Sequence, residues 1–232
     1  MRGPRTRVAA AVQNPLEPRR PRFRRQLPEQ RRAALIAATI ESLKRYGHEG
    51  LSIRTISAQA GVSVGLINHH FPNKDELVAA AFSHFNRELV DALKTAAARA
   101  DTPAARLRAF LEASFSPPNL DADVLTVWVV FWGIYRHSRP IQRVRRETYA
   151  DYVRLIRGLL ADLLGRAAEG GRGRGKGGVN LRLAAIGFTA LLDGLWLEWC
   201  LEPGRFRPRE AVALCEGWVE ALCRRAPGWN SA

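Results

Sequence analysis

The sequence predicts an all-α protein in which an N-terminal three-helix unit precedes a larger helical domain. Over several long segments apolar residues recur at i, i+3, i+4 and i+7, the spacing of an amphipathic helix. Residues 52–71 have the pattern of two short helices joined by a tight turn. With 232 residues, 47% of them hydrophobic and 25% charged, the chain can form one or two globular domains.

The start of the chain is strongly basic. Residues 1–27 hold eight arginines and four prolines but a single acid, Glu17, so this segment cannot form a hydrophobic core. We expect it to be disordered in the free protein. It is either an arm that follows the phosphates or enters the minor groove of a duplex, or a solvated tail or sequence upstream of the true start.

The first helix is expected to begin at Pro28 and to end at Gly47. One face carries an apolar stripe with a period of 3.6 residues, formed by Ala33, Ile36, Ala37, Ile40 and Leu43. This stripe supplies the core against which residues 52–71 can pack.

Residues 52–71 are expected to form a helix-turn-helix. The Ser52 hydroxyl can accept from the first turn of one helix, and Gly61 can end that helix because glycine adopts a positive φ without a Cβ clash. Ser63 can cap the second helix, which Pro72 ends. The inward face of the first helix consists of Ile53, Ile56 and Ala60. Two short helices around such a turn are typical of proteins whose second helix lies in the major groove of DNA.

The second helix of this motif offers side chains to the base pairs. If Leu66, Ile67 and Phe71 face inward, the outward residues are Val64, Gly65, Asn68 and His69. Asn68 can donate to and accept from an adenine edge, and Val64 can contact a thymine methyl group. The residues expected to contact phosphates are Ser52, Arg54, Thr55, His70 and Lys74, and Ser63 is also expected to lie in the DNA-binding site. For His69 and His70 the alternative is a surface pair without a function.

A long helix is expected to follow the motif. Asn73 can cap it, Glu76 can complete a capping box, and Asp75 lies favourably at the positive end of the helix dipole. Lys74 is unfavourable to the helix at this end. Its position is consistent with a phosphate shared between its ammonium group and the nearby amides.

Residues 60–82, AGVSVGLINHHFPNKDELVAAAF, resemble the helix-turn-helix and linker helix of the tetracycline-repressor (TetR) family. The resemblance covers residues 29–89. Asn68 departs from the family pattern, since many members carry a phosphate-contacting tyrosine there, and it is similar to the choline-responsive BetI type. The segments 128–132 (WVVFW) and 191–197 (LLDGLWL) also resemble BetI-type sequences. The positions that match the TetR pattern are Ala60 to Ser63, Gly65, His70, Phe71, Lys74 and Leu77.

The resemblance implies a DNA-binding domain over residues 28–89 and a domain for effector binding and dimerisation over 90–226. Residues 124–135 are apolar nearly all round, which predicts a central buried helix. A glycine-rich stretch, residues 168–179, is expected to be a flexible loop. The other helices are expected at 104–115, 143–164, 181–201 and 209–224.

The resemblance also implies a homodimer through the helices near 181–201 and 209–224. Both carry more apolar surface than one face needs, and Gly187 and Gly194 would let a partner helix approach closely. A symmetric dimer would bind an inverted-repeat operator in double-stranded DNA. Because Asp193 and Glu198 interrupt the apolar run at 183–201, we expect a buried helix of a soluble protein and no membrane partner.

Aromatic residues on two helices are candidates for a small-organic-cation effector site, although the residues alone favour ordinary core packing. Such a cation is attracted to ring faces and to a carboxylate. Trp128, Trp132 and Tyr135 share one helix face, and Trp196, Trp199 and Asp193 lie close together on another helix. The choline-type resemblance favours a quaternary ammonium effector; the alternative is ordinary core packing.

We expect a cytoplasmic transcriptional repressor that is not an enzyme. No phosphate loop, nucleophile elbow or metal-binding motif is present, so no cofactor, metal or catalytic residue is predicted. Cys200, Cys215 and Cys223 have no metal-ligand spacing and are expected to be buried thiols. The net charge of +14 suits an anionic polymer, although an arginine-rich chain also follows from genome composition. The alternative function is an architectural DNA-binding protein without an effector.

Overall fold

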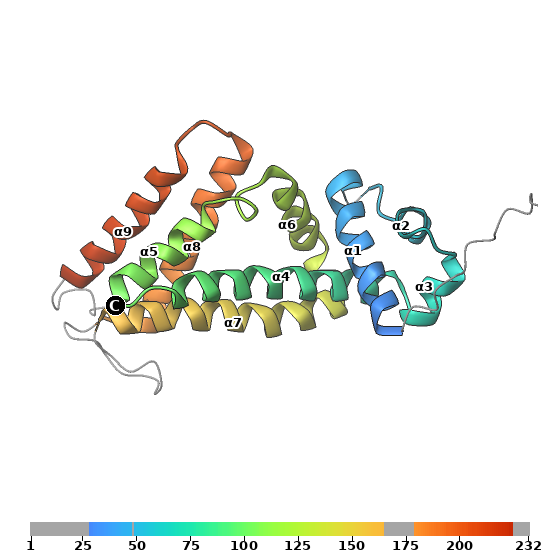
Figure 1. Ribbon diagram of the computed structural model, residues 1–232, viewed down its shortest axis with the longest axis horizontal. Coiled ribbons are helices and arrows are strands. Elements are labelled where there is room, and N and C mark those ends of the chain that lie inside the picture. Colours follow the sequence, from blue (N-terminus) through green and yellow to red (C-terminus); the bar gives the residue numbers. More distant parts are fainter. Residues whose placement is uncertain (1–27, 48, 165–178, 225–232) are drawn as a thin grey trace, which may run out of the picture.

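The computed structural model describes residues 28–47, 49–164 and 179–224, and the predictions made for residues 1–27 and for the loop beginning at 168 fall almost wholly outside these ranges. The described residues form helices only, so the predicted all-α class is confirmed. Two long helices, α4 and α7, lie side by side along the molecule (Figure 1). The helices are α1 Pro28–Tyr46, α2 Ile53–Ala60, α3 Val64–His70, α4 Lys74–Ala98, α5 Pro103–Ser114, α6 Ala122–Tyr135, α7 Arg139–Leu163, α8 Leu181–Leu201 and α9 Pro208–Arg224.

The ends of α2, α3 and α4 follow their capping residues. The Ser52 and Ser63 hydroxyls accept from backbone N–H groups of the first turns of α2 and α3. Gly61 ends α2 with φ 63°, in the left-handed region. The Asn73 side-chain oxygen accepts from the Glu76 N–H at 2.9 Å. The predicted helix boundaries in this part of the chain are therefore confirmed.

The capping box predicted at the start of α4 does not form. The Glu76 carboxylate accepts instead from the Arg143 guanidinium at 2.9 Å. Arg143 belongs to α7. A full charge on a neighbouring helix forms a stronger hydrogen bond with a carboxylate than a backbone amide does, so the tertiary ion pair replaces the local one.

Two hydrophobic clusters divide the molecule. The first joins α1, α2, α3 and the start of α4 to α6 and to the start of α7. Leu43, Ile56 and Ile67 are fully buried in it, and Val127 and Phe131 bring α6 into it. The predicted domain boundary at residue 89 lies inside α4, which runs without a break from the first cluster into the second. A movement of α6 therefore acts directly on the core of the helix-turn-helix unit.

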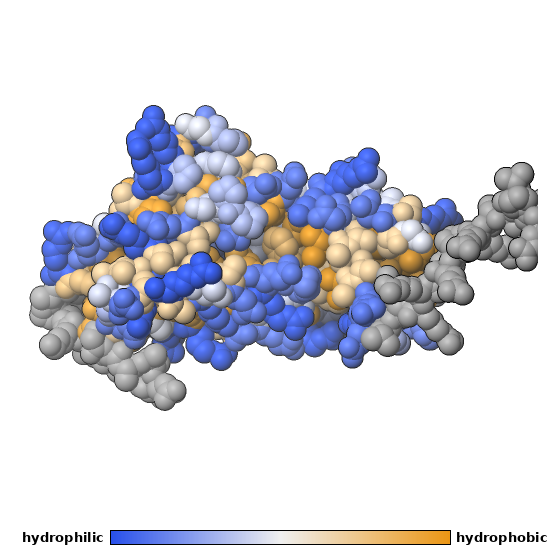
Figure 2. All heavy atoms as spheres, in the orientation of Figure 1, coloured by the Kyte–Doolittle hydropathy of each residue, from blue (hydrophilic) through white to orange (hydrophobic). Residues whose placement is uncertain are grey.

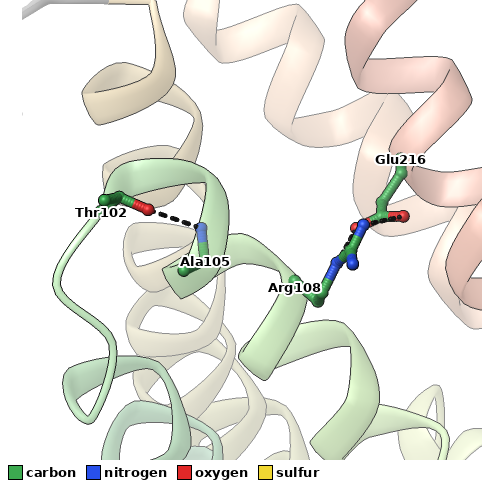
Figure 3. Close-up of polar contacts among 4 residues, drawn as sticks. All are labelled: Thr102, Ala105, Arg108 and Glu216. Atoms are coloured by element: carbon green, nitrogen blue, oxygen red, sulfur yellow. Dashed lines mark hydrogen bonds and ion pairs between the residues drawn. The ribbon is translucent and has the colours of Figure 1, made fainter.

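The second cluster packs the rest of α4 against α5, α7, α8 and α9. Thr102 caps α5 by accepting from the Ala105 N–H at 3.2 Å, and two turns of chain later Arg108 meets Glu216 of α9 (Figure 3). The guanidinium donates twice to this carboxylate, at 2.7 and 3.1 Å. The ion pair lies at the surface, so it adds little to stability but orients α9 on α5.

Three details correct the sequence-based expectations. Helix α6 is not a central buried helix, because the side chains of Val129 and Trp132 are 51% and 41% exposed. Gly187 does not receive a partner helix: a Cβ there would lie 3.4 Å from the Trp218 ring of the same chain, so this glycine lets α9 approach α8. Cys223 is exposed, whereas the other two cysteines are buried as expected.

Candidate nucleic-acid interface and interior cavity

Helix α3 presents one side to solvent and the other to the core. Ile67 is 0% and the adjoining Phe71 2% exposed, while Leu66 is half-buried. The exposed residues are Val64, Gly65, Asn68 and His69. The orientation predicted for this helix is confirmed, and direct contact of these residues with base pairs stays a prediction.

Two of the residues predicted to contact phosphates have their hydroxyl groups engaged within the protein. The Thr55 hydroxyl accepts from the Ser52 N–H at 2.8 Å and lies 3.0 Å from the Gly50 carbonyl. The Ser52 hydroxyl accepts from the Thr55 N–H at 3.1 Å. This reciprocal pair fixes the start of α2, next to the exposed Arg54.

Lys74 and His70 lie close to the same surface. The half-buried Lys74 ammonium group donates to the Leu51 carbonyl at 3.4 Å and so ties α4 to the chain before α2. Desolvation lowers the pKa of His70, and the positive charges of His69, Arg31 and Arg32 lower it further. A neutral imidazole still has one N–H group to donate to a phosphate.

Arg32 is a residue that the sequence did not single out. Its guanidinium lies 4.2 Å from the centre of the Phe71 ring and donates to the His70 carbonyl at 3.4 Å. It therefore holds α1 against the end of α3 by a cation–π contact and a hydrogen bond. The outward position of Arg32 beside the apolar stripe of α1 gave no signal for this role, because the contact joins residues far apart in sequence.

A cavity of about 1120 Å³ lies between α1, α4, α6, α7 and α8. Of the six residues predicted to bind an effector, four line it: Trp128, Trp132, Asp193 and Trp196. Tyr135 lines an adjoining cavity of about 880 Å³, which shares Trp132, Arg145 and Tyr149 with the first. Trp199 lines neither of these two and packs against the second hydrophobic cluster.

The indole rings in the larger cavity are held by other rings. Trp128 meets Phe82 and Phe85 edge to face, with ring centres 5.5 and 5.8 Å apart. The ring centre of Trp132 lies 6.1 Å from that of Trp128. The Trp196 N–H donates to the Asn119 carbonyl at 2.9 Å, which fixes the third indole.

Asp193 places a carboxylate in this aromatic environment. Desolvation raises its pKa to about 6, and the positive charge of Arg145 opposes this shift. Arg145 itself lies 3.9 Å from the centre of the Tyr149 ring. Within the part of the chain that the structure describes, Asp193 makes no ion pair at contact distance. The residue as a whole is exposed and lines the cavity, whereas the carboxylate itself is partly desolvated.

Asn86 and Tyr152 were missed by the sequence-based prediction. Asn86 is only 5% exposed, lines the cavity, and makes no hydrogen bond to any described residue. Tyr152 lines the cavity from α7, and burial raises the pKa of its hydroxyl group. The sequence did contain a signal for Asn86, because it is a polar residue at a core position of α4, one turn after Phe82. Tyr152 was part of an apolar stripe and could not be distinguished from core.

Charge on the cavity wall is opposite in sign to that of the whole chain. Six carboxylates and three permanently charged bases line the cavity, whereas the chain carries a net charge of +14. Glu41, Glu88 and Asp91 pair with neighbours on their own helices. The other three carboxylates, Asp121, Asp123 and Asp193, have no ion pair among the described residues and favour a cation over an anion. No group of three or more His, Cys, Asp or Glu side chains that could hold a metal ion occurs among the residues placed by the structure.

Two family profiles match the chain and together cover most of its length. Residues 35–81 match "Bacterial regulatory proteins, tetR family", and residues 103–224 match "BetI-type transcriptional repressor, C-terminal". The chain belongs to the TetR family. Its C-terminal half is of the BetI type, so the resemblance found in residues 60–82 and in the two tryptophan-containing segments is confirmed.

Individual relatives of the TetR family agree with this assignment. The transcriptional regulator BetI of Burkholderia thailandensis is 33% identical over 195 residues, which is 84% of this chain and 94% of that protein. The crystal structure of a transcriptional regulator from Pseudomonas aeruginosa PAO1 is 44% identical, covers 88% of this chain and 95% of its own, and has a TM-score of 0.76. The chain is therefore a transcriptional regulator of the TetR/BetI type.

A more distant structure with the same fold carries a ligand. The transcriptional regulator from Saccharomonospora viridis, solved in complex with choline, is 18% identical, covers 83% of this chain and 96% of its own, and has a TM-score of 0.69. At this identity the likeness shows a common fold.

Proposed function

We propose that this TetR-family regulator is a homodimeric repressor that binds an inverted-repeat operator and is released from it by a small organic cation. The single observation that carries the effector part is the desolvated carboxylate of Asp193 in a negatively charged, tryptophan-lined cavity. A quaternary ammonium ion has the charge and the affinity for ring faces that this site requires.

The DNA-binding part is supported by the exposed side of α3. Asn68 reads one base pair and Val64 contacts a thymine methyl group, while Arg54 and Lys74 contact phosphates. Gly65, His69 and His70 complete the contact, and the capping pair Ser52 and Thr55 positions the start of α2. Such a division between base-reading and phosphate-positioning residues is usual for a helix-turn-helix.

The dimer is supported by apolar surface left uncovered on the C-terminal helices. Among the described helices, α8 alone is long and apolar enough to span a membrane by length and composition, and 33% of its most apolar stretch is buried. Leu183 and Ile186 of α8 and Leu214 of α9 are 43%, 49% and 56% exposed. Burying such side chains against a second copy is favourable. In the resulting dimer the two recognition helices can reach successive major grooves.

Choline is the first effector to test. The Asn86 amide, which is unpaired inside the cavity, can bond the hydroxyl group of choline while Asp193 attracts its charge. A regulator of the same fold was solved with choline bound. The match of the C-terminal domain to the BetI type also supports this choice.

Selection of bound fragments from random duplex DNA, with and without choline, tests the whole proposal. We expect an enriched inverted repeat, with half-sites about one helical turn apart, that is lost when choline is added. Asp193→Asn should keep the inverted repeat and strongly weaken the response to choline. Enrichment of no particular sequence, together with uniform loss of binding as salt rises, would instead support an architectural DNA-binding protein.

A further inference from the structure

The cavity that contains Asp193 is larger than a choline-sized ligand needs. Its volume of about 1120 Å³ exceeds the roughly 300–1000 Å³ typical of pockets for drug-sized molecules. Choline is much smaller than a drug-sized molecule. Most of the cavity would therefore remain filled with water around it, in contact with apolar walls.

The additional space follows α4. Cavity-lining residues of this helix extend from Phe82 to Ala96, a distance of about 21 Å at 1.5 Å per residue. Beyond the aromatic cluster the wall comes from α4 and from the end of α5, and it includes Glu88, Asp91, Thr95 and Ser114 as well as an apolar part. We call this apolar part the apolar channel, formed by Leu89, Ala92, Leu93, Ala96, Phe115 and Pro118.

The surface view agrees with an opening into apolar surroundings. Figure 2 shows apolar residues gathered in the middle of the molecule, where α1, α4 and α6 meet, with hydrophilic residues around them. Exposed residues such as Glu41 and Asp91 line the same cavity, so it reaches the surface. A ligand can therefore enter with its charged group first, and its apolar part then lies along α4.

We propose that the effector is an amphipathic cation, with a quaternary ammonium or similar head at Asp193 and an apolar tail in the apolar channel. This inference rests on the proposed function and specifies the ligand of its effector site. The head is selected by the carboxylate and the indole rings, and the tail by the burial of its methylene groups. A tail that displaces water from apolar walls gains affinity with every carbon buried.

A series of alkyltrimethylammonium ions from methyl to octyl, used below their micelle concentrations, tests the channel by calorimetry on the full-length protein. Each buried methylene is worth about 0.8 kcal/mol, so we expect about a fourfold gain in affinity per carbon until the channel is full. Operator release should follow the same order. Equal affinity for the methyl and octyl ions would overturn the channel while leaving the cation site in place.

A matched pair of variants separates the channel from general apolar binding. Ala92 is exposed on α4 and lines the channel, so Ala92→Phe should fill it and stop the gain at a shorter chain without weakening tetramethylammonium. Ala98 is equally exposed on α4 but lies outside the cavity lining, so Ala98→Phe should behave as the wild type. Identical chain-length profiles for both variants would overturn the proposal. Absence of binding by every ion in the series would overturn both this inference and the proposed effector.

Discussion

At the scale of single residues, the proposed role of Asp193 makes effector binding depend on pH. Its carboxylate has a pKa of about 6 because burial desolvates it, and it interacts electrostatically with Arg145 and with the Tyr152 hydroxyl group. A cation binds the ionised form. We expect affinity for choline to fall about fivefold between pH 6 and pH 5 and to be nearly level above pH 7. Calorimetry over this pH range measures the affinity for choline. For Asp193→Asn we expect weak binding with an affinity that does not change with pH. A wild-type affinity that is independent of pH would contradict the role assigned to Asp193.

The raised pKa of Asp193 also affects the stability of the ligand-free protein. The pKa of Asp193 in the folded protein is higher than its ordinary value of 3.8, so protonation favours the fold. This part of the stability is present below about pH 4 and is lost as pH rises through about 6. At pH 7 we expect Asp193→Asn to raise stability by on the order of 1 kcal/mol, after allowance for water in the cavity. Thermal unfolding should show a gain of about 2–4 °C at pH 7 that disappears at pH 4.

Asn68 and Lys74 should differ in what they do for DNA binding. Asn68 is exposed on α3, whereas the Lys74 ammonium group lies at the start of α4. Asn68→Ala should relax the preference at one base pair by about 1–3 kcal/mol. Lys74→Ala should weaken every sequence alike and reduce the salt dependence by about one ion. Titration against the selected operator and its single-base variants measures both; equal losses on all sequences for the two variants would remove Asn68 from base reading.

At the scale of the helices, two glycines of the helix-turn-helix should respond oppositely to alanine. Gly61 has φ 63°, a conformation that costs a residue with a Cβ roughly 1–2 kcal/mol. Gly65 is helical, and an added Cβ would meet only the Ser63 hydroxyl at 3.9 Å. We expect Gly61→Ala to lower stability and Gly65→Ala to raise it by about 0.5–1 kcal/mol. Chemical denaturation measures both; changes of the same sign would contradict the assigned backbone roles.

The same comparison explains how far sequence alone could predict the fold. Ser52, Gly61 and Asn73 act on their own helix ends, so local chemistry was sufficient to place α2, α3 and α4. The exposure of α6 and the contact between Gly187 and Trp218 depend on which helix lies opposite. An apolar helix is compatible with a core, a cavity wall or an interface, and spacing along one helix does not distinguish among them.

Prediction of the candidate site was limited in the same way. The Trp128–Trp132 pair and Asp193 were found because aromatic rings near a carboxylate are an unusual combination. Asn86 and Arg145 come from α4 and α7, and only the packing of these helices brings them to the same cavity. The position of Trp199 one turn from Trp196 was misleading, since α8 turns the two rings to different surroundings.

At the scale of the whole molecule, the arrangement of the helices is compatible with the proposed dimer. The chain has one recognition helix at one end and the uncovered apolar side chains of α8 and α9 at the other (Figure 1). Two such chains joined through α8 and α9 would present their α3 helices on the same side of the dimer. The spacing between the two α3 helices would then depend on the packing around α4 and α6. A ligand in the cavity contacts both helices, so it can change operator affinity without touching α3.

A charged substitution in the proposed interface tests this arrangement. Ile186 is 49% exposed on α8, and Val129 is similarly exposed, at 51%, on α6. Ile186→Arg should convert the dimer to a monomer, because an unpaired charge cannot be buried between two apolar faces, and should weaken operator binding at least a hundredfold through loss of the second half-site. Val129→Arg carries the same added charge outside α8 and α9, so it should leave both properties intact. Sedimentation equilibrium and operator titration give the answer. A dimeric Ile186→Arg protein with full operator affinity would mean that the two copies meet elsewhere. A wild-type protein that stays monomeric at micromolar concentration would contradict both the dimer and the proposed inverted-repeat operator.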